Sequence, residues 1–383
     1  MKIGFLTPEY PHEKVHLAAG IGTSVGNLAT ALVNENVAVS VFVFGQKADE
    51  VFVADGIKIH LIALKKYRFF GWYKYRKHLQ NYINSSILSE NIDLIEAPDW
   101  TGMTAFMNLK APLVIRFHGT DAYFCHLEKR KQKWKNFIFE KLGILKAAAY
   151  IAPTDFAGKI TKQIFSLKKP VETIHNGLSL AHFENPHPEQ FTKGLILYIG
   201  TIIRKKGVLE LPEIFEKVLA DFPEAQLVLI GGDAFDIKTQ SASTWEMMQD
   251  KMSENVKNRT NYLGKVPYYQ IQEYIKKANV CVFPTFAETL GMVTIESMAM
   301  QKPVVNSNIG WSKELIDDGI NGFLVHPQDH DLYADRIISL LRNDDLCLRI
   351  GKAARKKVES NFDIEKLAKQ NKVFFERIIK RKN

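Results

Sequence analysis

The chain has 383 residues, which is more than one hydrophobic core usually supports, so we expect two domains. Hydrophobic residues make up 46% of it and charged residues 24%, and no apolar run approaches the roughly 18 residues that cross a bilayer. The net charge of +9 suits nucleic acid, anionic lipid or a phosphorylated ligand. Three widely separated cysteines, without zinc-ligand spacing, predict a reduced compartment. The first residues are typical of a buried strand and not of a signal peptide, so a cytoplasmic protein is expected.

Short β-branched runs alternate with stretches of helical spacing, which predicts parallel sheets covered by helices. The strands expected in the first half are residues 2–6, 37–44, 58–61, 94–96, 113–117 and 150–152. Prolines and a turn signal at His175-Asn176-Gly177 then indicate a linker within residues 168–193. The alternation restarts with residues 195–199, 226–230, 280–283, 303–306 and 323–325. The predicted fold class is therefore α/β, with two doubly wound, Rossmann-like halves.

We divide the chain into four parts. Residues 1–170 are expected to form an N-terminal Rossmann-like domain, 171–193 a linker, and 194–360 a C-terminal Rossmann-like domain. Residues 361–383 form a last helix, expected to cross back to the N-terminal domain, with a basic tail. Because open α/β sheets bind ligands beyond the carboxyl ends of their strands, the loops after strands are the places to search for a site.

The loop after the first strand contains Gly20 and Gly22, before a helix expected from about residue 25 to residue 34. Glycines at the start of a helix let backbone amides approach a phosphate. A packing turn explains this pattern as well, and the third glycine of the dinucleotide fingerprint is absent. After strand 113–117, His118 precedes a glycine, so its ring either faces a ligand or has a structural role.

The loop of residues 200–207 carries Arg204, Lys205 and Lys206 between two glycines. Cations at a strand end suit a diphosphate, although a charge run is often only a solvated face. After strand 280–283, Glu288 and Glu296 are separated by seven residues. Carboxylates accept hydrogen bonds from sugar or ribose hydroxyls, and the helix start between them offers amides to phosphate oxygens. The alternative is a helix-start charge and an unrelated surface glutamate.

These residues resemble a known family. Residues 288–296, followed by 297–299 and 302–305, are similar to the E-x7-E signature of the retaining glycosyltransferases of GT-B architecture called family 4. The likeness continues at residues 176–177, 263–267, 314–316 and 321–325, and is densest in the second half. The resemblance implies two Rossmann-like domains that face each other across a cleft. Residues 1–170 would be the acceptor-side domain and residues 194–360 the nucleotide-sugar-binding domain.

The resemblance also implies roles at matching positions. Glu296 would hold the ribose hydroxyls, Glu288 would face the transferred sugar, and His118 would lie against sugar and phosphates. The remaining donor contacts implied are Lys206 and the amides of Leu290, Gly291, Met292 and Val293 at the diphosphate, Gly20 and Gly22 closing the site, and the backbone of Val266 at the base. The donor would be a nucleotide diphosphate sugar, UDP-sugar before GDP-sugar, with no cofactor and no metal.

Two positions depart from the family pattern. Thr201 stands where an arginine is usual, so Arg204 is the expected substitute, and Ala19 replaces a usual glycine. Separately, Asp329-His330-Asp331 resembles a metal-binding signature of another glycosyltransferase architecture, but it precedes a predicted helix, so N-capping explains it better.

The acceptor side is suggested by surface type alone. Asp99 and Trp100, after strand 94–96, are a candidate acceptor pair. Residues 65–77 interleave cations and aromatics without an acid, and Lys129 to Lys135 add five more cations. Such a stretch suits an anionic membrane, single-stranded nucleic acid, or a half-buried helix with solvated lysines. The residues assigned to the candidate membrane contact are Lys65, Lys66, Trp72, Lys74, Arg76 and Lys77.

The predicted function is transfer of a sugar to a saccharide or lipid-linked saccharide, in the synthesis of a cell-surface polysaccharide or glycolipid. Because many relatives in this family act on lipid-linked saccharides, the membrane is favoured over nucleic acid, and the protein is expected to be peripheral on the inner face of the cytoplasmic membrane. The alternatives are a nucleotide-sugar epimerase of the same fold and a basic nucleic-acid-binding protein on an inactive scaffold.

Overall fold

The computed structural model spans residues 1–383 and is described for residues 1–16 and 19–381. The chain divides into two compact units: Met1–Ser179 with Asp363–Asn383, and Leu180–Phe362. Ala18, in the predicted glycine loop, and Lys382, in the predicted basic tail, lie outside the described residues.

The described part of the first unit contains an eight-stranded sheet in the order β3-β4-β2-β1-β5-β6-β7-β8. Its strands are β1 (Lys2–Thr7), β2 (Ala38–Gln46), β3 (Glu50–Ala54), β4 (Ile57–Ala63), β5 (Leu94–Pro98), β6 (Leu113–Arg116), β7 (Ala149–Ala152) and β8 (Val171–Thr173). All neighbouring strands pair in parallel except β3 and β4. Apolar strands covered on both faces read as continuous hydrophobic runs, as β1 and β2 do.

The antiparallel edge strand β3 was not predicted, although its turn carries a hairpin signal. Asp55 and Gly56 have φ angles of 49° and 75°, the left-handed pair that a two-residue hairpin needs. Asp-Gly is a preferred sequence for this turn, and it pairs Ala54 with Ile57 at the base of the hairpin.

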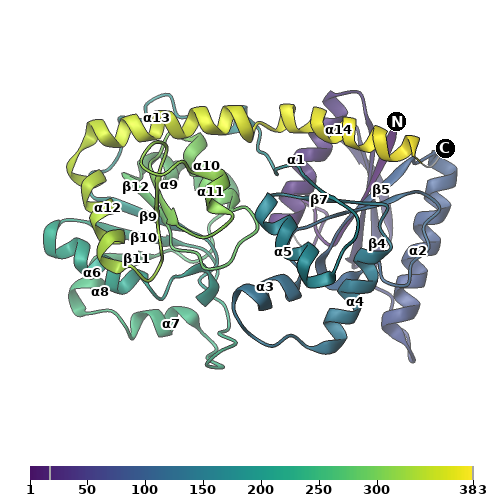
Figure 1. Cartoon of the computed structure of the whole chain (residues 1–383), viewed down its shortest axis with the longest axis horizontal. Helices are drawn as coiled ribbons and strands as arrows, with labels where there is room; N and C mark the ends of the chain where they lie inside the picture. The colour runs from purple at the N-terminus through teal and green to yellow at the C-terminus, as the bar shows by residue number, and fades with distance from the viewer. Residues whose placement is uncertain (17–18, 382–383) are drawn as a thin grey trace. The chain divides into compact units, whose positions relative to one another are not determined.

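Helices flank the sheet of the first unit (Figure 1). They are α1 (Gly20–Asn34), α2 (Gly71–Glu90), α3 (Asp121–Leu127), α4 (Trp134–Leu145), α5 (Asp155–Phe165) and α14 (Ile364–Lys380), with a 3-10 turn at Trp100–Gly102. The last helix, α14, packs on α1, and its Leu367 and Phe374 share a core with Leu28 and Leu32. The buried Arg116 on β6 donates to Glu96 at 2.7 Å and to Asn371 of α14 at 2.5 Å. The final helix is therefore part of the first unit.

The predicted linker, residues 171–193, is not a free connection throughout. Its first residues form β8, which pairs with β7, and the division between the units falls after Ser179. A 3-10 turn follows at Leu180–His182. The linker was predicted from prolines and a glycine turn. The structure instead places Val171 in an edge strand, although the next two residues of that strand are polar and exposed.

The second unit has a six-stranded parallel sheet, within the described residues, in the order β11-β10-β9-β12-β13-β14. Its strands are β9 (Leu195–Ile199), β10 (Gln226–Ile230), β11 (Thr260–Tyr262), β12 (Val280–Phe283), β13 (Val304–Ser307) and β14 (Phe323–Val325). Renumbered within the unit, this is the order 3-2-1-4-5-6 of a doubly wound Rossmann sheet. Its helices are α6 (Leu211–Asp221), α7 (Thr244–Gln249), α8 (Glu254–Asn258), α9 (Tyr268–Lys277), α10 (Met292–Ala299), α11 (Ser312–Leu315), α12 (His330–Arg342) and α13 (Asp344–Asn361), with a 3-10 turn at Arg204–Lys206.

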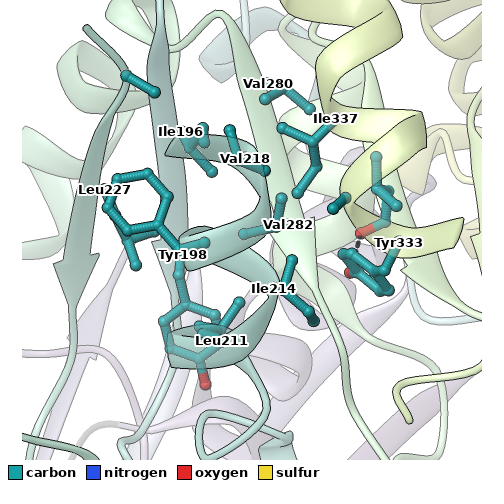
Figure 2. Packing of buried hydrophobic residues seen from close by; sticks show 14 of the residues in the cluster. Ile196, Tyr198, Leu211, Ile214, Val218, Leu227, Val280, Val282, Tyr333 and Ile337 are labelled. Carbon is teal, nitrogen blue, oxygen red and sulfur yellow. Dashed lines mark hydrogen bonds between the residues drawn. The ribbon is translucent and has the colours of Figure 1, made fainter. Parts of the chain in front are cut away.

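Figure 2 shows how the helices of the second unit close over its sheet. Ile196 and Val282 from the central strands meet Ile214 of α6 and Ile337 of α12, all nearly inaccessible to water. The buried Tyr333 hydroxyl donates to the Val305 carbonyl at 2.6 Å, which satisfies the one polar group of this ring. This packing fixes the carboxyl ends of β9 and β12, from which the candidate site is built.

Candidate functional site

The switch point of the second unit lies between β9 and β12, where the strand order reverses. The loop after β9 and the loop after β12 touch there. Gly207 has a φ of 70°, and a Cβ at this position would lie 1.7 Å from the Pro284 carbonyl oxygen. The Phe286 amide also donates to the Lys205 carbonyl at 2.8 Å. Glycine at 207 is therefore needed for the close approach that brings the two predicted loops together.

Lys206 and Glu288 meet across these loops. The Lys206 ammonium contacts the Glu288 Oε2, and the Thr289 amide donates to Oε1 at 3.1 Å. Burial alone would raise the pKa of Glu288, but the Lys206 charge and these hydrogen bonds leave the pKa below its ordinary value. The pair keeps an ionised carboxylate and a cation side by side at the switch point.

Glu296 lies on α10, which follows the loop of Glu288, and has a different environment. Its side chain is on α10, 4% exposed, and Oε1 accepts a hydrogen bond from the Tyr268 hydroxyl at 2.7 Å. Burial raises the pKa of Glu296 to about 7. The two glutamates thus have opposite pKa shifts, because Glu288 has a cationic partner and Glu296 has a neutral one.

The helix that carries Glu296 starts at a glycine. Gly291 is the N-cap of α10 with a φ of 92°, and no side chain caps this end. Met292 and Val293 are in the first turn and half-buried, and Leu290 is buried just before it. Val266 lies half-buried in the loop between β11 and α9, two residues before Tyr268. The predicted donor residues of the second unit, Arg204 and Lys206 of the loop after β9 included, therefore lie in loops and at a helix start at one end of its sheet.

Arg204 has a partner that the sequence did not reveal. Its guanidinium forms two hydrogen bonds of 2.8 Å with the carboxylate of Asp236, which is 2% exposed. Thr239 donates to the same carboxylate at 2.6 Å. Bidentate pairs of this kind hold both groups in fixed positions. Asp236 therefore positions Arg204, as Glu288 positions Lys206, and the assignment of Arg204 as the substitute for the missing arginine at Thr201 stays a prediction.

In the first unit the switch point lies between β1 and β5, and Glu9 occupies the start of α1. Glu9 is 5% exposed, and its Oε1 accepts from the Ile21 amide at 3.1 Å, with further bonds from the amides of Ala19 and Gly22. Burial raises the pKa of Glu9 despite these bonds. The helix starts at Gly20 and not near residue 25 as predicted, because Glu9 satisfies the amides of its first turn.

The two glycines of this turn are not equivalent. A Cβ at Gly22 would lie 2.9 Å from backbone atoms of Glu9 and Tyr10, whereas one at Gly20 would meet no atom within 4 Å. The packing explanation therefore accounts for Gly22, and a carboxylate of the protein takes the anion position that the sequence suggested for phosphate.

His118 and Asp99 lie together after β6 and β5. The Asp99 Oδ1 accepts from the His118 amide at 2.9 Å, and Asp99 is 1% exposed, while Trp100 is 41% exposed. Burial raises the pKa of Asp99 to about 7. Burial and the nearby Arg116 charge lower the pKa of His118 to about 3, so its ring is neutral at pH 7. Asp99 is committed to the backbone of His118, which differs from the prediction that it joins Trp100 in holding an acceptor.

The basic and aromatic stretch is only partly at the surface. Lys65, Lys66 and Lys74 are exposed, and Trp72 is 39% exposed. Arg76 was assigned to the same surface but is buried, donating to the Trp72 and Gly102 carbonyls and stacking on Phe139. Arg76 is thus a structural residue, since the helix period turns it inward.

Lys77, also assigned to this surface, is half-buried and donates to the carbonyl of Phe106 at 2.7 Å. The large exposed side chains of this stretch are instead Phe69, which is 62% exposed, and Phe70, which is 70% exposed. On α4, outside this stretch, Trp134 is 77% exposed.

The acidic signature at residues 329–331 has structural partners. Asp329 accepts from the Leu332 amide at 3.2 Å as the N-cap of α12, and Asp331 pairs with Lys217. His330 is bonded between Glu210 and Glu213. The N-capping interpretation is confirmed. In the part of the chain that the structure describes, no three His, Cys, Asp or Glu residues are grouped as metal ligands.

Three residues that matter here were missed by sequence reasoning: Glu9, Asp236 and Tyr268. None lies in a motif, and each acts through a partner distant in sequence. Among the described residues, no helix has both the length and the apolar character that crossing a bilayer requires.

The fold, with its two switch points, matches that of known glycosyltransferase structures. The structure superposes on sucrose-phosphate synthase from Thermosynechococcus elongatus with a TM-score of 0.79 at 19% identity, over 100% of both chains. It also matches HepE of Anabaena, solved with UDP and glucose, with a TM-score of 0.72 at 18% identity, over 98% of this chain and 99% of that one. The chain has the GT-B fold, with two Rossmann-like parallel-sheet domains.

The family follows from the sequence profiles. The description "Glycosyl transferases group 1" matches residues 182–357, and "Glycosyltransferase Family 4" matches residues 18–182. The chain belongs to this family of GT-B glycosyltransferases, as the E-x7-E resemblance implied. An uncharacterised glycosyltransferase of Methanocaldococcus jannaschii is 25% identical over 363 residues, which are 88% of this chain and 89% of the relative.

Proposed function

We propose that this glycosyltransferase moves a sugar from a nucleoside diphosphate donor to a saccharide or lipid-linked saccharide, with retention of the anomeric configuration. The observation that carries the proposal is the pairing of Lys206 with Glu288 beside the uncapped start of α10. A cation and free helix amides suit a diphosphate, and a carboxylate next to them suits sugar hydroxyls.

Each residue of the proposed donor site has its own role. Glu296 accepts hydrogen bonds from the ribose, and the backbone near Val266 meets the base. Lys206 and the amides of Met292 and Val293 stabilise the charge that develops on the departing diphosphate. His118 lies against the sugar with a neutral ring, which donates or accepts a hydrogen bond without adding charge.

Retention fits a front-face reaction. The bond from the anomeric carbon to the donor phosphate oxygen breaks, and the acceptor oxygen bonds to that carbon from the same face. The acceptor proton passes to the departing phosphate oxygen. Negative charge grows on the diphosphate, where Lys206 and the start of α10 are assigned, so no metal step is needed in this scheme.

The donor base is proposed as uracil first and guanine second. Support comes from HepE of Anabaena, solved with UDP-glucose, and from TarM of S. aureus, solved with UDP and Fondaparinux. The epimerase and nucleic-acid-binding alternatives are not favoured, because both family profiles describe glycosyl transfer.

We also propose that the first unit contacts an anionic membrane, as suits a lipid-linked acceptor on the cytoplasmic face. We define the aromatic–basic surface by its exposed residues Lys65, Lys66, Arg68, Phe69, Phe70, Trp72 and Lys74. Phe70 holds a left-handed backbone with φ 52° as the N-cap of α2, a conformation disfavoured for phenylalanine. Exposed rings beside cations suit the headgroup region of a membrane.

The donor assignment is tested by a thermal-shift screen of nucleotide sugars and nucleoside diphosphates. A ligand at 100 times its dissociation constant should stabilise the protein by about 2.7 kcal/mol. Glu288→Gln and Glu296→Gln should each remove most of the transfer activity while the protein stays folded. Glu254→Gln, at an exposed surface position, is the matched control. Wild-type turnover in either site variant would contradict the proposal.

A further inference from the structure

Tyr268 is a partly exposed residue whose hydroxyl donates a hydrogen bond to a buried carboxylate. It is the first residue of α9, which is anchored by the buried Ile271 and Ile275. Tyr268 is 52% exposed, yet its hydroxyl lies 2.7 Å from Oε1 of Glu296, which is 4% exposed. The backbone of Tyr268 is therefore fixed by a packed helix, while its ring extends over the surface to reach the carboxylate.

The neighbouring tyrosine provides a contrast. Tyr269 is 73% exposed, and its hydroxyl accepts a hydrogen bond from the adjacent Gln270 at 3.1 Å. Two consecutive tyrosines thus occupy the same turn, and Tyr268 is the one that contacts a residue of the proposed donor site.

A ribose presents two adjacent hydroxyls, and a carboxylate has two oxygens that can accept one hydrogen bond each. The phenol is a single donor placed on one of those oxygens. Each ribose hydroxyl can donate to its own carboxylate oxygen only when Oε1 does not already accept from the phenol. An occupied Oε1 therefore competes with the second ribose hydroxyl.

We propose that the Tyr268 hydroxyl is a stand-in for a ribose hydroxyl on Glu296, and that it leaves this carboxylate when a nucleotide binds. This inference rests on the proposed function, in which Glu296 holds the ribose. Tyr268 then satisfies the buried carboxylate of the empty enzyme, and its half-exposed ring moves aside with little loss of packing. It is a positioning and specificity residue, which makes displacement favourable for a ligand that brings two hydroxyls.

The exchange has a measurable consequence. Removing the phenol hydroxyl takes a hydrogen bond from the empty enzyme and none from the nucleotide complex. Hydrogen bonds to charged groups contribute enough that Tyr268→Phe should tighten nucleotide binding by about tenfold. A nucleotide without ribose hydroxyls does not displace Tyr268, so its affinity should not change.

The experiment uses isothermal titration calorimetry on the full chain with UDP and GDP, and then with the 2′,3′-dideoxy form of the tighter binder. Wild type, Tyr268→Phe and the matched control Tyr269→Phe are compared, with thermal unfolding as the check on folding. We expect Tyr268→Phe to bind the ribose form about tenfold tighter and the dideoxy form as wild type does. Tyr269→Phe should match wild type for both ligands.

The inference is overturned if Tyr268→Phe binds the ribose form no tighter than wild type, or if it gains equally with the dideoxy form. Glu296→Gln separates this failure from that of the proposed function. If Glu296→Gln weakens nucleotide binding but Tyr268→Phe does not strengthen it, only the role of Tyr268 is wrong. If wild type binds no nucleoside diphosphate, the proposed donor site itself is wrong.

Discussion

The affinity for a nucleoside diphosphate should rise with pH through about 7 because of Glu296. Burial raises the pKa of this carboxyl to about 7, and ribose hydroxyls donate best to its ionised form. If only that form binds, the ionised fraction falls about tenfold from pH 8 to pH 6, and affinity should fall about tenfold with it. One pH unit below the pKa corresponds to about 1.4 kcal/mol.

The raised pKa of Glu296 also makes the free energy of unfolding depend on pH. The pKa of Glu296 is higher in the folded protein than its ordinary value of 4.5. Its contribution is therefore fully present below pH 4.5 and is lost as the pH rises through 7, by an amount on the order of 3 kcal/mol. Glu296→Gln should remove this component of the pH dependence of unfolding.

Calorimetric titration at pH 6, 7 and 8 measures the binding effect. The terminal phosphate of the nucleotide titrates in the same range, so Glu296→Gln defines the part of the slope that does not come from the carboxyl. The reasoning is refuted if wild type shows no rise in affinity, or if Glu296→Gln shows the same slope as wild type.

Four further predictions concern the assigned charges. Lys206→Ala should lower kcat by about 100-fold through loss of a contact to the departing diphosphate, Lys205→Ala should have little effect, and steady-state kinetics on both would expose a reversed order. Arg204→Ala should lower the Tm because it leaves the buried Asp236 carboxylate without its cation, and an unchanged Tm in calorimetry would contradict the structural role. Transfer should persist in excess EDTA, and activity that disappears and returns with magnesium would redirect attention to metal chemistry. Three exposed cations are changed together to Ser: Lys65, Lys66 and Lys74. This variant should leave anionic vesicles at lower salt than wild type in sedimentation, with nucleotide binding unchanged.

Strands with strong hydrophobic runs could be predicted from the sequence, and polar edge strands could not. The apolar β9 and β12 have the predicted bounds, because both faces of a central parallel strand are buried. The missed β8 and β11 are three residues each and largely polar, so their pairing comes from the neighbouring strand and not from their own composition. For β3 the Asp55-Gly56 turn was a usable signal.

The candidate site could be predicted as far as loops and residue types. The spacing of Glu288 and Glu296 indicated both carboxylates, and the loop after β9 indicated Lys206. The partner of each group could not be predicted, because a hydrogen bond between Tyr268 and Glu296 joins residues 28 positions apart. Opposite pKa shifts in two glutamates of one motif follow from those partners and not from the motif.

Partners distant in sequence also explain why two predicted phosphate contacts are made to carboxylates of the protein in this structure. Glu9 takes the start of α1, and Asp236 takes the guanidinium of Arg204. Each carboxylate is buried, and a buried charge stays ionised only where donors or a cation surround it, so glycine amides and arginine serve internal acids as readily as phosphate. In the second unit Lys206 also pairs with a carboxylate, that of Glu288, so the start of α10 is the assigned anion contact that no side chain caps. Thr201 at the usual arginine position therefore predicts a diphosphate held by fewer fixed charges, with more of its stabilisation from backbone amides.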